Sequence, residues 1–275
     1  MNKSVRNILD VLLYVVAFLM TSIGVQLASG LIWALHSGQA IDAVLNGLAH
    51  GQYPMLLIVS TVVSGILTIV LFGCMQWSPF SNKYIRTRPW GVIFWTVMLT
   101  IGLILPTEWL YEKLQIAMDE STAVLFEGVM REPFGYIAIG IVAPIAEEMV
   151  FRGAVLRTLL KFFSSRAYWV AIVVSALLFA LVHGNMAQGV HAFLIGLLLG
   201  WMYYRTGSIV LGIVLHWVNN SVAYVMFNLM PEVSDGKLID LFRGDERTMY
   251  MALLFSMLVF LPSLFQVVVR TKSNN

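Results

Sequence analysis

Two adjacent carboxylates, Glu147 and Glu148, lie in the middle of an apolar stretch, and Arg152 follows Glu148 at helical spacing. Burying one charge at the centre of a membrane helix costs about 3 kcal/mol, so ionisable residues there indicate a functional site. Because residues at i and i+4 share a helix face, Arg152 can neutralise Glu148. Glu147 points about 100° away from that pair. We interpret Glu148 and Arg152 as supporting residues and Glu147 as a candidate general base.

Pro144 precedes this pair of carboxylates and removes one helix hydrogen bond. A kink at Pro144 would open space beside Glu147. The alternative for the same residues is a helix-packing salt bridge with a spare glutamate.

Two histidines lie on later apolar segments, each paired with a second residue at helical spacing. Phe179 precedes His183 by four residues, so the phenyl ring can pack beside the imidazole, although a single histidine near a helix end is often only a packing residue. His216 and Asn220 share a face, and Asn219 lies one step away. An amide can orient an imidazole or donate to a developing oxyanion. The alternative is simple hydrogen bonding between membrane helices.

Taken together, these groups predict hydrolysis by a bound water molecule. Glu147 can accept the proton from water, or a zinc ion held by His183, His216 and Glu147 can acidify it. The sequence has no HExxH motif, so it does not decide between a zinc-dependent and a metal-free reaction. His191 is expected to pack rather than to react, and the alternative is that it contacts a catalytic residue and supports it.

The composition is that of an integral membrane protein. Hydrophobic residues make up 59% of the 275 residues, charged residues only 12%, and the mean hydropathy is +0.81. Soluble domains carry about 25% charged residues. Segments of about 20 apolar residues can span a membrane, which predicts an all-α polytopic bundle of about eight helices. The expected spans are residues 8–35, 54–77, 89–106, 134–160, 167–183, 187–204, 208–230 and 248–269.

Charges in the predicted loops set the orientation. With the N-terminus in the cytoplasm, most loop lysines and arginines fall on the cytoplasmic side, for example Lys83, Arg86 and Arg88. The opposite loops hold most of the acidic residues, such as Glu127 and Glu132. The positive-inside rule therefore predicts that both termini are cytoplasmic.

The remaining segments suggest one membrane domain over residues 1–275. We find no internal repeat, and no basic run or phosphate loop that would indicate a nucleic-acid partner. Residues 108–117 are either an amphipathic helix on the membrane surface or a polar connection. Gly196 and Gly200 have the spacing of a small-residue helix contact.

The three motifs, in this order on successive apolar helices, resemble those of the CPBP family. This family comprises CaaX prenyl proteases and bacteriocin-processing intramembrane proteases, also called the Abi family. The motifs are Glu147-Glu148-x-x-x-Arg152, Phe179-x-x-x-His183 and His216-x-x-x-Asn220. The resemblance covers residues 134–230, which would form the catalytic core.

The resemblance implies an intramembrane endopeptidase that acts on a membrane-associated peptide or protein. Glu147 would activate the attacking water with help from His183, while His216 and Asn220 would hold the water or the oxyanion. Glu148, Arg152 and Phe179 would support the site. Members are often described as metalloproteases, and a metal-free glutamate mechanism is also argued.

The resemblance also implies a location in a bacterial inner (plasma) membrane, with the lipid bilayer and a peptide or membrane protein as partners. A first alternative is a non-catalytic immunity or scaffold protein that binds a peptide. A second alternative is a transporter with a proton-relay carboxylate, which the lack of an internal repeat disfavours.

Overall fold

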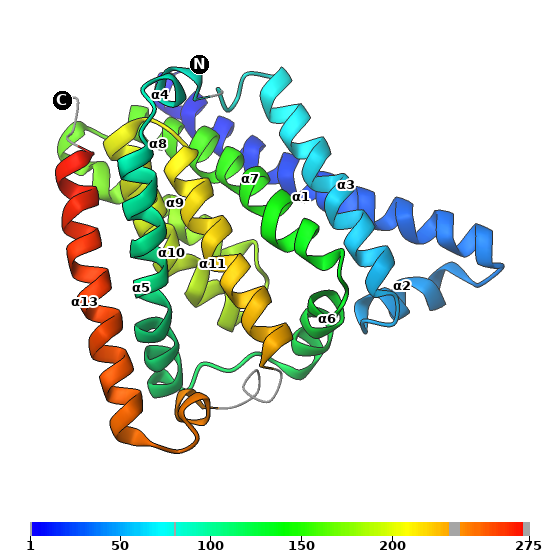
Figure 1. Ribbon diagram of the computed structural model, residues 1–275. Coiled ribbons are helices and arrows are strands. Elements are labelled where there is room, and N and C mark those ends of the chain that lie inside the picture. Colours follow the sequence, from blue (N-terminus) through cyan, green and yellow to red (C-terminus); the bar gives the residue numbers. More distant parts are fainter. Residues whose placement is uncertain (1, 80, 231–236, 272–275) are drawn as a thin grey trace. The chain divides into compact units, whose positions relative to one another are not determined.

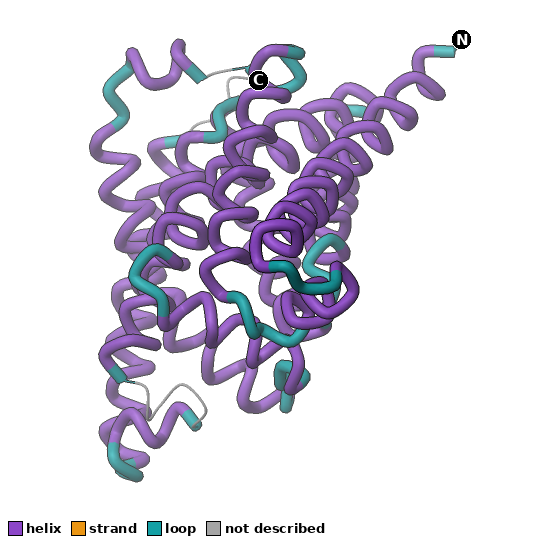
Figure 2. Tube along the Cα trace, turned by 90° about the vertical axis from the view of Figure 1, so that its right-hand side faces the viewer, coloured by secondary structure: helices purple, strands orange, loops and turns teal. Residues whose placement is uncertain are grey.

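The computed structural model describes residues 2–79, 81–230 and 237–271. Within these ranges it contains only helices and connecting loops, as Figure 2 shows. The predicted all-α membrane bundle is therefore confirmed. Six of the described helices are long and apolar enough to span a membrane: α1 (Lys3–Ser37), α3 (Pro54–Cys74), α5 (Trp90–Leu114), α10 (Met186–Thr206), α11 (Val210–Leu229) and α13 (Glu246–Arg270).

The predicted span at 134–160 is helical but changes type along its length. It passes through a π-helix η1 (Ile137–Val142), α7 (Ala143–Glu148), a second π-helix η2 (Met149–Leu156) and α8 (Arg157–Phe162). Pro144 lacks the N–H that would bond to the carbonyl four residues before it, so the regular pattern breaks just upstream. Single π turns often occur at functional sites.

The predicted span at 167–183 is shorter than expected. Helix α9 (Tyr168–Leu181) has 14 residues, which gives a length of about 21 Å at 1.5 Å per residue. The chain then turns through His183 and Gly184, where Gly184 adopts a φ of 73°. A left-handed backbone suits glycine because it has no Cβ.

Of residues 108–117, which were predicted to form either a membrane-surface helix or a polar connection, residues 108–114 are helical. Their location at the membrane surface stays a prediction. Helix α5 continues past Pro106 as far as Leu114 and ends where Gln115 adopts a φ of 52°. The short helices in the described ranges are α2 (Ile41–Ala49), α4 (Asn82–Arg86), α6 (Glu120–Arg131), η3 (Ser165–Ala167) and η4 (Leu238–Phe242).

The chain divides into two compact units. The first unit comprises residues 1–80 and 118–200, and the second comprises residues 81–117 and 201–275. The boundary falls within α10. The prediction of a single membrane domain stays a prediction.

In the first unit, close approaches between helices depend on small residues. Helix α1 packs along α3, and α3 packs against α7 (Figure 1). A Cβ on Gly65 of α3 would clash with Val142, and a Cβ on Gly153 of η2 would clash with the Ser78 hydroxyl. Gly196 lies against Ala176 of α9, so the predicted small-residue contact is confirmed.

In the second unit, α13 packs along α5, and α11 also contacts α5 (Figure 1). The Ser256 hydroxyl of α13 donates to the carbonyl of Gly102 over 2.9 Å. Arg205 donates to the carbonyls of Thr271 and Val268, which satisfies acceptors at the end of α13.

Candidate functional site

Glu148 and Arg152 form a fully buried ion pair in the first unit. Arg152 Nη1 donates to Glu148 Oε1 over 2.7 Å, and the two side chains are 1% and 0% exposed. Arg152 Nη2 also donates to the carbonyl of Gly196 over 3.4 Å. A buried ion pair needs good geometry and further hydrogen bonds to offset its desolvation. The ion pair predicted from the four-residue spacing is present, and the supporting role of the two residues stays a prediction.

Phe179 connects this ion pair to His183. The Arg152 guanidinium lies over the Phe179 ring, 4.4 Å from its centroid. The same ring meets the His183 imidazole edge-on, with 4.9 Å between the two ring centroids. Cation–π contacts of a desolvated guanidinium contribute about 2 kcal/mol. The first two sequence motifs therefore form one continuous contact chain inside the first unit.

The His183 ring is oriented by its own helix. Its Nδ1 lies 2.8 Å from the carbonyl oxygen of Phe179. A carbonyl oxygen only accepts hydrogen bonds, so Nδ1 must carry the proton. In the neutral imidazole, Nε2 then keeps its lone pair and can accept a proton or hydrogen bond. His183 as a whole is half-buried.

Glu147 has a different environment from its neighbour. It lies in the α-helical turn between the two π-helices, where the 100° separation from Glu148 is kept. Glu147 is half-buried and lines a pocket of about 190 Å³. Gly65 allows α3 to approach α7 closely at this point. The predicted space beside the carboxylate is therefore present.

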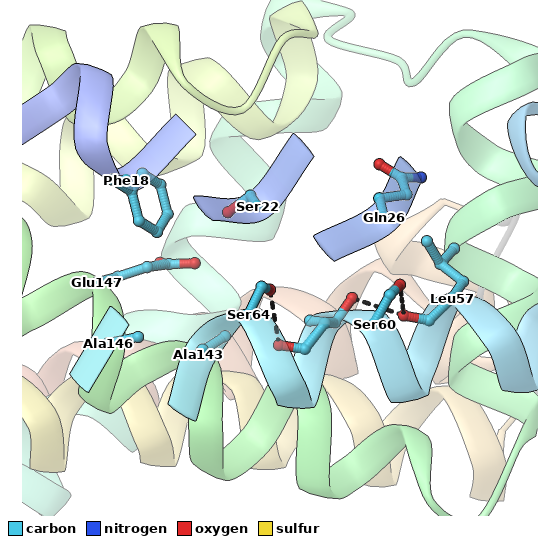
Figure 3. A pocket seen from close by; sticks show the side chains of 11 residues that line it. Phe18, Ser22, Gln26, Leu57, Ser60, Ser64, Ala143, Ala146 and Glu147 are labelled. Carbon is cyan, nitrogen blue, oxygen red and sulfur yellow. Dashed lines mark hydrogen bonds between the residues drawn. The ribbon is translucent and has the colours of Figure 1, made fainter. Parts of the chain in front are cut away.

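The pocket is lined by α1, α3 and α7. Figure 3 shows residues of α1 on one side and residues of α3 on the other, with Glu147 at the end near Phe18. Six of the eleven residues that line it are polar, and the other five are apolar. The polar residues are Ser22, Gln26, Ser60, Thr61, Ser64 and Glu147.

Sequence reasoning missed the five polar residues contributed by α1 and α3. No candidate site residue was predicted before residue 134. A signal was present, because Ser22 and Gln26 are at i and i+4, as are Ser60 and Ser64. Polar residues at that spacing form a stripe on one face of an apolar helix.

His216 and Asn220 lie on α11 in the second unit. His216 is buried at 7% exposure, and Asn220 is half-buried. The Asn219 amide donates to the Asn220 side-chain oxygen over 3.1 Å. Their predicted role beside Glu147 stays a prediction.

Metal binding also stays open. Among residues 2–79, 81–230 and 237–271, no group of three or more His, Cys, Asp and Glu side chains has the spacing of a metal site. His191 is half-buried on α10, close to its start.

The comparisons with known proteins agree with the motifs. Residues 130–222 match the family model described as "Type II CAAX prenyl endopeptidase Rce1-like", and this region contains all three motifs. The chain is 29% identical over 144 residues to UPF0177 protein YbdI of Lactococcus lactis subsp. lactis (strain IL1403), which covers 50% of this chain and 73% of that protein. No solved structure matches the chain.

Proposed function

Because residues 130–222 form a region of the CAAX-protease type, we propose that this integral membrane protein is an intramembrane endopeptidase with Glu147 as its general base. The substrate is a peptide or protein that lies in the membrane. The observation that carries this proposal is the contrast between the two glutamates. Glu148 is neutralised in a buried ion pair, whereas Glu147 borders a pocket that is lined in part by polar side chains.

In the proposed reaction, Glu147 accepts a proton from a water molecule. The resulting hydroxide attacks the carbonyl carbon of the peptide bond, and the proton then passes to the leaving amine. His183 helps to orient the water through Nε2, because its Nδ1–H is held by the Phe179 carbonyl. Positioned acids and bases of this kind contribute about 10²–10⁴-fold in rate.

His216 and Asn220 complete the proposal on the basis of the motif resemblance. They hold the water or donate to the oxyanion that forms on the substrate carbonyl. Loss of one such donor costs about 10²–10³-fold in rate. Zinc, when bound, would supply a Lewis acid for the same step.

The test is cleavage of a library of membrane-spanning peptides by the purified full-length protein in detergent. Wild type, Glu147→Gln and Glu127→Gln are compared, each with and without a chelator. Glu127→Gln is the matched control, because Glu127 pairs with Arg131 on the exposed face of α6. We expect cleavage by wild type and control, and loss of cleavage in Glu147→Gln.

Equal cleavage by all three proteins would contradict the assignment of Glu147. Loss of wild-type cleavage after chelation, restored by zinc, would indicate the metal-dependent form of the reaction. Cleavage that is unchanged by the chelator would indicate the glutamate form.

A further inference from the structure

The pocket beside Glu147 has the size of a single side chain. Its volume is about 190 Å³, and a cavity of about 150 Å³ in a protein core is enough to hold benzene. The α1 and α3 helices that form its walls lie outside the region matched by the family model. The catalytic motifs therefore do not explain these walls.

The walls present hydrogen-bond acceptors from α3. The hydroxyls of Ser60 and Thr61 both donate to the carbonyl of Leu57, over 2.9 and 2.8 Å. The Ser64 hydroxyl donates to the carbonyl of Thr61 over 3.0 Å. Figure 3 shows these bonds running back into α3. Since the proton of each hydroxyl is already donated to a backbone carbonyl, the hydroxyl oxygen can only accept a hydrogen bond from a ligand.

The opposite wall, formed by α1, contains two polar side chains that can form hydrogen bonds. Ser22 and Gln26 are both half-buried and line the pocket. Among the residues that the structure describes, neither side chain has a hydrogen-bond partner. A carboxamide has two donor hydrogens and an acceptor oxygen. A ligand with both a donor and an acceptor would match the two walls together.

A wholly apolar ligand would leave the polar side chains of these walls without hydrogen bonds. Leaving a buried donor or acceptor unsatisfied costs about 1–3 kcal/mol. An isoprenoid in the pocket would exclude water without offering any hydrogen bond to Gln26 or Ser22. A hydroxyl or carboxamide side chain would satisfy both walls.

We propose that this pocket is a substrate subsite, an inference that rests on the proposed function. The pocket takes a Ser, Thr, Asn or Gln side chain of an unprenylated membrane-spanning peptide, next to the bond that Glu147 attacks. Gln26 and Ser22 are the specificity-determining residues.

The test separates binding from cleavage. Full-length Glu147→Gln protein in lipid nanodiscs is immobilised and offered Leu/Ala membrane peptides that carry one Ser, Asn, Gln or Leu at successive central positions. Each peptide is supplied with and without a farnesyl group, and retained peptides are quantified by mass spectrometry. Ser22→Leu fills the pocket, whereas Ala28→Leu adds bulk to an exposed position of the same helix.

We expect Ser, Asn or Gln at one position to be enriched about tenfold over Leu, which is the effect of one hydrogen bond. Ser22→Leu should abolish this enrichment and Ala28→Leu should keep it. Gln26→Leu, which barely changes side-chain size, should shift the preference towards Leu. If Ser22→Leu does not fold, the peptide preference of Gln26→Leu alone tests whether the pocket is the subsite.

Equal retention of all peptides would overturn the subsite, as would the same profile in Gln26→Leu and Ala28→Leu. Preferential retention of farnesylated peptides that Ser22→Leu abolishes would also overturn it. The retained peptides are then offered to protein with Glu147 intact. Selective retention without cleavage would refute the proposed protease activity and keep the subsite. Cleavage together with a retention profile in Gln26→Leu that equals that of the unsubstituted pocket would keep the protease activity and refute the subsite.

Discussion

At the scale of residues, two adjacent glutamates have different surroundings because they lie on different faces of one helix. Glu148 faces Arg152 and is fully buried with it, whereas Glu147 faces the pocket. Spacing alone predicted this division. It did not predict that Gly196 and Phe179 would complete the surroundings of the guanidinium.

Arg152→Ala should destabilise the protein strongly, since it leaves Glu148 buried without its countercharge. We expect a loss of about 3–5 kcal/mol in the free energy of unfolding, measured by thermal unfolding in detergent. The control is Arg131→Ala, whose exposed partner Glu127 contributes less than about 1 kcal/mol. Replacing the whole pair with Glu148→Leu and Arg152→Met should recover much of the loss. Equal unfolding of the two alanine variants would refute a structural role for the pair.

His183→Asn should retain the fold and lose activity. An Asn amide can still donate to the Phe179 carbonyl but offers nothing at the position of Nε2. We expect kcat to fall by about 10²–10⁴-fold, with little change in thermal unfolding. His191→Asn is the control and should cleave like wild type. Similar rates in both variants would remove His183 from the reaction.

At the scale of elements, the stretch from Ile137 to Phe162 positions both glutamates through two changes of helix type. Pro144 accounts for the first change. The close approach of neighbouring segments then depends on glycines that no other residue can replace without movement.

Gly153→Ala should destabilise the first unit, because its new Cβ would clash with the Ser78 hydroxyl. Overpacking of this kind costs about 1–3 kcal/mol. Ser78→Gly in the same protein should restore stability, as measured by thermal unfolding. Gly24→Ala on α1, where a Cβ meets nothing within 4 Å, should be neutral or stabilising. A loss in Gly24→Ala as large as in Gly153→Ala would contradict this account.

The start of α6 should loosen in acid. Asp119 caps the helix, and hydrogen bonds from the Ser121 hydroxyl and then from Thr122 lower the pKa of Asp119 to about 2. Its stabilising effect is fully present above the ordinary carboxyl pKa of about 4 and is lost as the pH falls through 2. Hydrogen exchange of the Thr122 amide, corrected for intrinsic rates, should lose protection across this window. Unchanged protection in Asp119→Ala at pH 6 would refute the cap.

At the scale of the whole molecule, the charge pattern predicts that both termini lie in the cytoplasm. A green fluorescent protein fused after residue 275 should therefore fluoresce, and alkaline phosphatase inserted at residue 117 should be active. Removing the charges of Lys83, Arg86 and Arg88 together should weaken this orientation. An active phosphatase at the C-terminus would reverse the predicted topology.

The amino-acid sequence by itself determined the membrane class, the positions of the apolar helices and the three motifs. Those features follow from composition and from the 3.6-residue period, which are local properties of the chain. Only the tertiary structure brought Ser22 and Gln26 of α1 to the α3 hydroxyls beside Glu147. Their partners lie far away in the chain, and contacts of that kind depend on how helices pack, which no local spacing specifies. The separate surroundings of Glu147 and Glu148 were therefore predictable, whereas the pocket was not.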